Sequence, residues 1–560
     1  MRNRHLLIRI LLPILILSSV PAGLPSEAMN REIPVERETG RRIRRIPASV
    51  MLRERERALR EGLRLHPEWK IITPLRKTSW SFSVGSTRGW YAYDFITEKD
   101  YVVPSTCRAV GDNCYIFVEN AIWGTRVTQA SVDSIRNVFD LRTPADPTRG
   151  IYRMDIDIFG SVPNVDGDPR IIILILDIQD DFKTTGGYVG GYFDSTNEYD
   201  ISSSNRAEMI YLDADPVNLS SDEDIRESMS ITAHEFQHMI HWHQDSEEIT
   251  FVKEACSLEA EILCGYPIYD QDHYIHETNC SLLGWRYGEE GVHGDYARAA
   301  RFMAYVGEQA GTGVFRPMVG SAKTGIAGIN AGLTAVSLGR DFIALFRDWL
   351  VANILNDRSF DSRYGYADAG LMKPVPAVYP FSEVSDGQTV EPLAAVYLRF
   401  PAGPGFRIRF ETDEPNLLIK AVETGEAGPR VFDITPGVLY AEPDLDPGAD
   451  QRTFICMNTD LNRQARVSFT TTGSATGAAE LKWDETEPVG YLQLSIRDTV
   501  CVTFDAVPGA KLDSVRVALR RAGTITGGVW RYTGNTRPTP LGAQLAVPVS
   551  ATIATETPVP

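Results

Sequence analysis

The sequence predicts an α+β region over about its first two thirds and an all-β region after it. The apolar run at 169–178 indicates a buried strand, and the stretch 220–264, which lacks proline and glycine, indicates long helices. After the prolines of segment 374–380, short runs of alternating apolar and polar residues are separated by Gly, Pro and Asp. A period of two between such turns is typical of a β-sandwich. The change of periodicity near residue 374 therefore predicts a domain boundary.

Each further element follows from a local pattern. Residues 76–125 are rich in side chains that favour strands, and apolar positions over 128–141 have helical spacing. The segments 294–305 and 341–353 repeat this helical spacing. In the all-β region the alternating runs are 396–400, 406–410, 417–422 and 452–457.

The N-terminus has the pattern of a signal peptide. Met1–His5 is basic, an apolar run continues to Val20, and small residues suited to cleavage follow. The apolar run is short for a membrane span of about 20 residues, and no second apolar segment of that length follows. We therefore expect residues 1–28 to be removed, the mature chain to have no membrane span, and the protein to be secreted or periplasmic.

Changes in amino-acid composition along the chain predict a charged N-terminal segment and further domains after it. Residues 29–75 are crowded with Arg and Glu and include an expected polar helix at 49–61. This segment is either a propeptide, with a processing site at 41–45, or a flexible solvated arm. We expect the main domain over 76–373, a β-sandwich over 374–475, and a second β domain over 476–560, which could be incomplete.

Charge and cysteine content narrow the class of protein. The formal net charge of −18 over 560 residues argues against nucleic acid as a partner. Seven cysteines are compatible with export but are too few for a disulfide-dense framework. Cys107 and Cys114 flank an expected turn and could form a disulfide, and Cys456 could pair with Cys501.

The most informative motif is His-Glu-x-x-His at 234–238, inside an expected long helix. His234 and His238 stand four residues apart and share one helix face, so both imidazoles can bind one metal ion. Glu235 projects about 100° around the helix from His234, where it can accept a proton from water activated by zinc. The alternative is a surface helix with two incidental histidines.

A catalytic zinc site needs a third protein ligand. His241 shares the face of His234, but it lies about 10 Å farther along the helix, which is too far to bind the same ion with the turn between them. The third ligand should therefore come from a second helix, expected over 251–261, which carries three glutamates.

Together, the motif and this second helix resemble the gluzincin zinc metallopeptidases, and specifically the hyicolysin-like family. In that family an aromatic residue, a glutamate and a serine follow the motif in fixed register, and the glutamate is the third zinc ligand. Phe251 and Ser257 match that register and place Glu254 at the ligand position. Glu259 and Glu261 remain as rivals, and Glu261 could instead orient a ligand histidine.

The resemblance extends from about residue 114 to about residue 371. It implies a zincin-type catalytic domain, with segment 207–215 as the edge strand that borders the cleft. It also implies a zinc-dependent metalloendopeptidase that cleaves protein or peptide substrates, with Glu235 as general base and later proton donor. Tyr296 and His293, which follow the ligand helix, are candidates for stabilising the tetrahedral intermediate.

Two other classes of function stay open. One is a zinc aminopeptidase or another metal-dependent hydrolase that uses the same ligands. The other is a non-catalytic, metal-stabilised adhesion protein, against which Glu235 argues because structural zinc does not need that carboxylate. Acidic turns at 166–168 and 444–450 could bind Ca²⁺, although neither has the spacing of an EF-hand loop.

Overall fold

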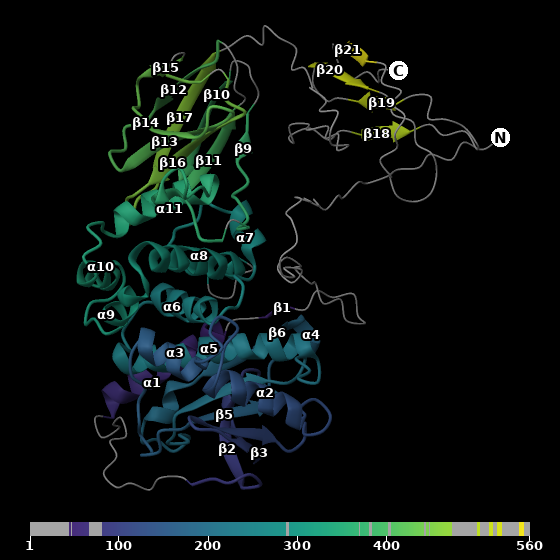
Figure 1. Cartoon of the computed structure of the whole chain (residues 1–560), viewed down its shortest axis with the longest axis vertical. Helices are drawn as coiled ribbons and strands as arrows, with labels where there is room; N and C mark the ends of the chain where they lie inside the picture. The colour runs from purple at the N-terminus through teal and green to yellow at the C-terminus, as the bar shows by residue number, and fades with distance from the viewer. Residues whose placement is uncertain are drawn as a thin grey trace, which may run out of the picture.

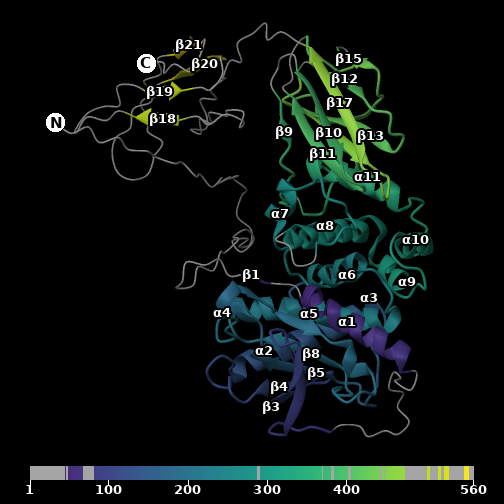
Figure 2. The same cartoon turned by 180° about the vertical axis from the view of Figure 1, so that it is seen from behind.

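The protein has three layers along its long axis: an N-terminal α/β lobe, a middle layer of helices and a β-sandwich (Figure 1). The view from behind shows the same order (Figure 2). The predicted signal peptide, 1–28, lies outside the described residues. The computed structural model describes residues 44–45, 48–66, 81–286, 291–368, 370–379, 384–400, 405–441, 444–446 and 448–472, together with four strands between 501 and 553.

A six-stranded mixed sheet organises the N-terminal lobe, in the order β2-β3-β4-β5-β8-β7. The three strands β4, β5 and β8 run parallel, and the outer pairs are antiparallel. Every residue of β5 is buried, as expected for a parallel strand covered on both faces. The strands are β2 (Thr87–Asp94), β3 (Lys99–Val110), β4 (Cys114–Glu119), β5 (Ile171–Leu176), β7 (Gly191–Phe193) and β8 (Met209–Asp213).

The edge of this sheet differs from the expectation. The resemblance implies that segment 207–215 is the edge strand. This expectation is wrong, because β8 pairs with β5 on one side and with β7 on the other. The edge strand is β7, which is three residues long. The sequence did not predict β7 as a strand because the segment is short and begins with a glycine.

Alternate residues of β5 build two separate cores. The odd-numbered residues pack with α2 (Gln129–Asp140), α3 (Ile151–Ile158) and α5 (Asp222–Gln244). The even-numbered residues belong to a second core, which includes Ala48 and Leu52 of α1 (Ala48–Leu65). The period of two along the strand therefore sends neighbouring side chains to opposite faces.

The charged N-terminal segment packs onto the lobe. Strand β1 (Arg44–Arg45) pairs in parallel with β6 (Gly187–Tyr188). From α1, Arg55 forms salt bridges of 2.8 Å with both Asp100 and Asp194. These contacts argue against a flexible solvated arm for the described part of this segment, and its role as a propeptide stays a prediction.

The middle layer is helical, and α6 lies in it between α5 and α8 (Figure 1). Asp341 caps α11 by accepting a hydrogen bond from the Ala344 amide. Among the described residues, no helix is both long and apolar enough to span a membrane. The helices are α6 (Thr250–Leu263), α7 (Gln271–His276), α8 (Val292–Ala310), α9 (Phe315–Val319), α10 (Ile326–Ala335) and α11 (Phe342–Leu355).

Two facing sheets form the β-sandwich around their own apolar core. The first contains β10 (Val384–Val390), β17 (Ala465–Thr472), β12 (Arg407–Glu411) and β15 (Leu439–Tyr440). The second contains β14 (Arg430–Ile434), β13 (Leu417–Thr424), β16 (Gln451–Asn458), β11 (Ala394–Phe400) and β9 (Ala377–Val378). Beyond them, β18 (Cys501–Phe504) pairs with β19 (Val515–Ala518), and β20 (Gly523–Gly528) pairs with β21 (Pro548–Ile553).

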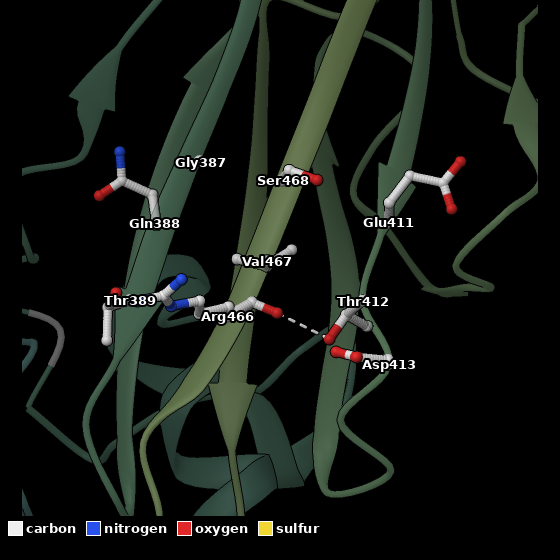
Figure 3. Close-up of a pocket in the computed structure, with 9 residues that line it drawn as sticks. All are labelled: Gly387, Gln388, Thr389, Glu411, Thr412, Asp413, Arg466, Val467 and Ser468. Carbon is white, nitrogen blue, oxygen red and sulfur yellow. Dashed lines mark hydrogen bonds between the residues drawn. The ribbon is translucent and has the colours of Figure 1, made fainter.

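An open hollow lies on the outer face of the first of these sheets (Figure 3). Most of the residues that line it are polar and none is aromatic, and Thr412 donates a hydrogen bond of 2.7 Å to the Arg466 carbonyl beside it. The helical layer separates the sandwich from the N-terminal lobe (Figure 1). The hollow is therefore remote from the predicted motif on α5.

The six cysteines with described side chains are free thiols. The predicted Cys107–Cys114 disulfide is wrong because the two side chains lie in different cores, Cys107 on the α1 side of the sheet and Cys114 on the α5 side. Cys456 is buried in the sandwich. The side chain of Cys501, its predicted partner, lies outside the described residues.

The sandwich and the helical layer share one apolar core. Tyr397 and Ile455 of the sandwich belong to the same cluster of buried residues as Trp349 of α11. The Tyr397 hydroxyl also donates a buried hydrogen bond of 2.9 Å to the Leu350 carbonyl. Buried side chains therefore pack across the predicted boundary near residue 373. This packing favours coupled unfolding of the helical layer and the sandwich.

Replacing Tyr397 tests this coupling. We expect Tyr397→Ala to lower the free energy of unfolding by about 3–5 kcal/mol, the usual cost of deleting a large buried ring. Hydrogen–deuterium exchange should then accelerate in α11 as well as in β11. Tyr397→Phe, which keeps the ring, should cost only about 1–3 kcal/mol. Unchanged exchange in α11 of the alanine variant would show that the two parts unfold independently.

Candidate metal centre

Helix α5 positions the His-Glu-x-x-His motif. Ser221 caps the helix by accepting a hydrogen bond of 3.2 Å from the Asp224 amide. Phe236 packs into the core on the sheet side. His234 and His238 lie together, with ring centroids 4.7 Å apart. The cap and the core contact therefore fix both the start and the rotation of the helix.

A buried hydrogen bond sets the register between α5 and α6. The Ser257 hydroxyl donates to Gln237 Oε1 at 2.6 Å, and both residues are fully buried. A buried polar pair of this kind tolerates little sliding, because a shift would leave both groups unpaired. The pair holds α6 so that Glu254 faces the two motif histidines.

Three ligand atoms converge between the two helices. His234 Nε2 and His238 Nε2 are 3.1 Å apart. Glu254 Oε2 is 3.3 Å from His234 Nε2 and 3.5 Å from His238 Nε2. Among the described residues, these three form the group of His, Cys, Asp or Glu side chains whose ligand atoms lie close enough to hold one ion.

This triangle fits zinc. Tetrahedral ligands at bond lengths of 2.0–2.2 Å lie about 3.3–3.6 Å from one another, and the three separations here are 3.1, 3.3 and 3.5 Å. Two imidazoles and one carboxylate leave the fourth tetrahedral position open, which is the donor set of a catalytic rather than a structural site. Glu254 is also almost completely buried, so its carboxylate needs a cationic partner.

Glu261 contacts the ring nitrogen of His234 that is not one of the three ligand atoms. Its Oε1 lies 2.7 Å from His234 Nδ1, and its Oε2 accepts a hydrogen bond from the Ser230 hydroxyl. A carboxylate at Nδ1 keeps the proton on that nitrogen and turns Nε2 toward the metal position. The sequence identified Glu261 as a rival ligand or an orienting group, and this geometry favours the orienting role. Ser230 was missed, although it stands one turn before His234.

The charged groups at the site make metal binding depend on pH. Burial opposes a charge on His234, but hydrogen bonds to Glu254 and Glu261 outweigh it and raise the pKa of His234 to about 10. Burial also opposes a charge on Glu254, yet the neighbouring His238 and His234 hold the pKa of Glu254 well below its usual range. In the metal-free protein a proton therefore occupies His234 at neutral pH. A metal ion must displace it, so acidification weakens metal binding.

The third glutamate of α6 points elsewhere. A side chain at Gly307 of α8 would meet Glu259 Oε1, so Glu259 faces α8 and not α5. Its Oε2 is buried without a hydrogen-bond partner among the described residues, and burial raises the pKa of Glu259 well above its usual range. Glu259 is therefore a poor candidate for the metal ligand.

The remaining candidates contact other groups or are buried. His241 is buried, and burial lowers its pKa to about 3. Tyr296 packs edge-on against Trp285, with centroids 4.8 Å apart, and His293 Nδ1 lies 3.2 Å from Asp270 Oδ2. Both belong to α8, on the side of α6 away from α5 (Figure 1). Their catalytic roles stay predictions.

Alanine variants at the three glutamates of α6 test the ligand assignment. We expect Glu254→Ala to lose its zinc on dialysis, because it removes one of three ligands. Glu261→Ala should bind zinc about 10–100-fold more weakly, the usual cost of losing an orienting carboxylate. Glu259→Ala is the matched buried control and should keep full zinc content. Retention of zinc by the 254 variant, with loss from either other variant, would contradict the assignment.

Part of the chain is similar to a known metalloprotease. Over 171 residues it is 32% identical to the neutral metalloprotease ShpI of Staphylococcus hyicus, in a match that covers 28% of this chain and 39% of that protein. The chain thus spans less than half the length of this relative. No family model matches the chain.

Likeness to solved structures is weak. The periplasmic lysozyme inhibitor PliG of Salmonella Typhimurium is 8% identical and has a TM-score of 0.14, covering 17% of this chain and 96% of its own. A PliG mutant from Escherichia coli is 11% identical with the same TM-score of 0.14, covering 18% of this chain and 100% of its own. Likeness at this level carries no argument about fold or function.

Proposed function

We propose that this protein is a secreted zinc-dependent metalloendopeptidase of the gluzincin type, with a zincin-type catalytic domain. The observation that carries the proposal is the triangle of His234 Nε2, His238 Nε2 and Glu254 Oε2, with sides of 3.1–3.5 Å. The similarity to a neutral metalloprotease supports the same class of activity. Export is supported by the basic and apolar pattern of residues 1–28.

The chain's own residues supply positioning and proton transfer. His234, His238 and Glu254 would hold zinc, which, when bound, acts as a Lewis acid that lowers the pKa of water and polarises a peptide carbonyl. Glu235 follows His234 on α5, and its side chain is almost buried, which would strengthen its interaction with a reacting proton. Glu235 would accept a proton from the attacking water and deliver it to the leaving amine.

The other two classes of function make different demands. An aminopeptidase needs acidic groups that hold the substrate's amino terminus, and an adhesion protein needs no proton acceptor at the metal. Digestion of casein with and without a chelator distinguishes them. Chelator-sensitive cleavage of casein supports the endopeptidase. Activity only on short aminoacyl substrates favours an aminopeptidase, and inactivity on both favours the adhesion protein.

A conservative change at Glu235 tests the mechanism. We expect Glu235→Gln to lower the rate of peptide hydrolysis by about 10²–10⁴-fold or more, because the amide cannot accept the proton. Zinc content should stay near one ion per chain, since Glu235 is outside the ligand triangle. Glu223→Gln, on the exposed first turn of the same helix, is the control and should keep full activity. A zinc-loaded Glu235→Gln variant with full activity would rule out this mechanism.

A further inference from the structure

The two edge strands of the six-stranded sheet, β2 and β7, lie close together. The Tyr93 amide of β2 donates a hydrogen bond of 3.1 Å to the Tyr192 hydroxyl of β7. The side chain of Asn205, in the connection from β7 to β8, forms hydrogen bonds of 2.8 and 2.9 Å with the amide and the carbonyl of Tyr91. The sheet therefore curves until its two edges meet, at a junction that we call the seam.

One face of α1 packs on the sheet at this seam. Ala48, Leu52 and Leu59 are buried, and together with Arg55 they stand four, three and four residues apart, which places all four on one side of the helix. Ala48 and Leu52 belong to the apolar core that also contains aromatic rings of both edge strands. Removal of α1 would therefore expose part of this core to water, at a cost in free energy that grows with the apolar area exposed.

Arg55 connects the two sides of the seam. Its guanidinium forms salt bridges of 2.8 Å with Asp100 of β3 and with Asp194, which directly follows β7. The same group lies 4.5 Å from the centre of the Tyr93 ring of β2. The Arg55 side chain is 13% exposed and that of Asp194 is 8% exposed. A carboxylate this deeply buried is costly once its cation is removed, so Asp194 depends on Arg55.

Farther along, α1 reaches the loop that joins the two ligand helices. Arg60 Nη1 lies 2.6 Å from Glu247 Oε2, and Arg60 Nη2 donates a hydrogen bond of 3.0 Å to the Ser246 carbonyl. Both partners belong to the connection between α5 and α6. This ion pair is exposed, and exposed pairs contribute little to stability. Most of the binding free energy of α1 should therefore arise at the seam and not at this loop.

We propose that α1 is a permanent part of the mature protein and that the seam is its binding surface. Composition alone predicts a removable propeptide or a solvated arm over 29–75. A helix that left the seam would open an apolar core and deprive the buried Asp194 carboxylate of Arg55, whereas a helix that stays keeps both contacts. Any N-terminal processing therefore ends before Ala48, and α1 stays bound even when the chain is cut between α1 and β2.

The N-terminus of the mature protein provides one test. The full chain is expressed with its predicted signal peptide, and the purified folded protein is analysed by N-terminal sequencing and mass spectrometry. We expect to find residues 48–65, either within the main chain or as a peptide bound to it. Folded protein that begins after residue 66 and carries no such peptide would overturn the proposal. This readout does not depend on peptidase activity, so its failure is distinct from failure of the proposed function.

A cut between α1 and β2 tests retention directly. A recognition sequence for a specific protease is inserted between residues 70 and 76 of the full chain, and the folded protein is cut to completion. We expect the N-terminal fragment to co-elute with the remainder in gel filtration and to separate only in denaturant. Release of the fragment together with unfolding of the remainder also supports the proposal, because the lobe then needs α1. Release from a remainder of unchanged Tm contradicts it.

Three arginine variants of the cut protein identify the contacts that retain α1. We expect Arg55→Ala to speed dissociation of the fragment by about 30-fold or more, as truncation of a buried charge pair usually does. Arg60→Ala, at the exposed pair, should change the rate by less than about 5-fold. Arg64→Ala is the matched control and should leave the rate unchanged, because Arg64 pairs with Glu61 of the same helix. Equal effects of all three variants would show that charge alone retains the helix, and would contradict binding at the seam.

Discussion

The packing of α6 against α5 is the constraint on which the candidate metal centre depends. Helix α5 alone brings two imidazoles together, but the third ligand reaches them only if α6 has one particular register. The buried hydrogen bond between Ser257 and Gln237 and the contact of Glu261 with His234 both fix that register. Each of these contacts keeps α6 from sliding or rotating against α5, because such a shift would leave buried polar groups unpaired.

The two layers around these helices hold them in place. On one side, α5 packs on a sheet whose central strands are buried on both faces, with α1 covering the far face. On the other side, α8 packs on α6, and the core continues through α11 into the β-sandwich. The metal centre is thus built on packed helices, where ligand geometry is held more precisely than on loops.

Local features of the fold and site were predictable from the sequence, and features that depend on long-range pairing were not. The Ser221 cap, the apolar run of β5 and the alternating strands of the sandwich each follow from adjacent residues. The motif identified His234 and His238 by spacing alone, while Glu254 needed a family resemblance because α6 carries three glutamates. The edge position of β7 and the separation of Cys107 from Cys114 arise from tertiary contacts that spacing does not encode.

X-ray absorption spectroscopy of the zinc-loaded protein measures the central feature most directly, because it reports the number, type and distance of the ligand atoms. A site held by His234, His238 and Glu254 predicts four nitrogen or oxygen ligands at about 2.0–2.2 Å, with the outer-shell scattering of two imidazoles. Six oxygen ligands without imidazole scattering, or any sulfur ligand at about 2.3 Å, would contradict the assignment.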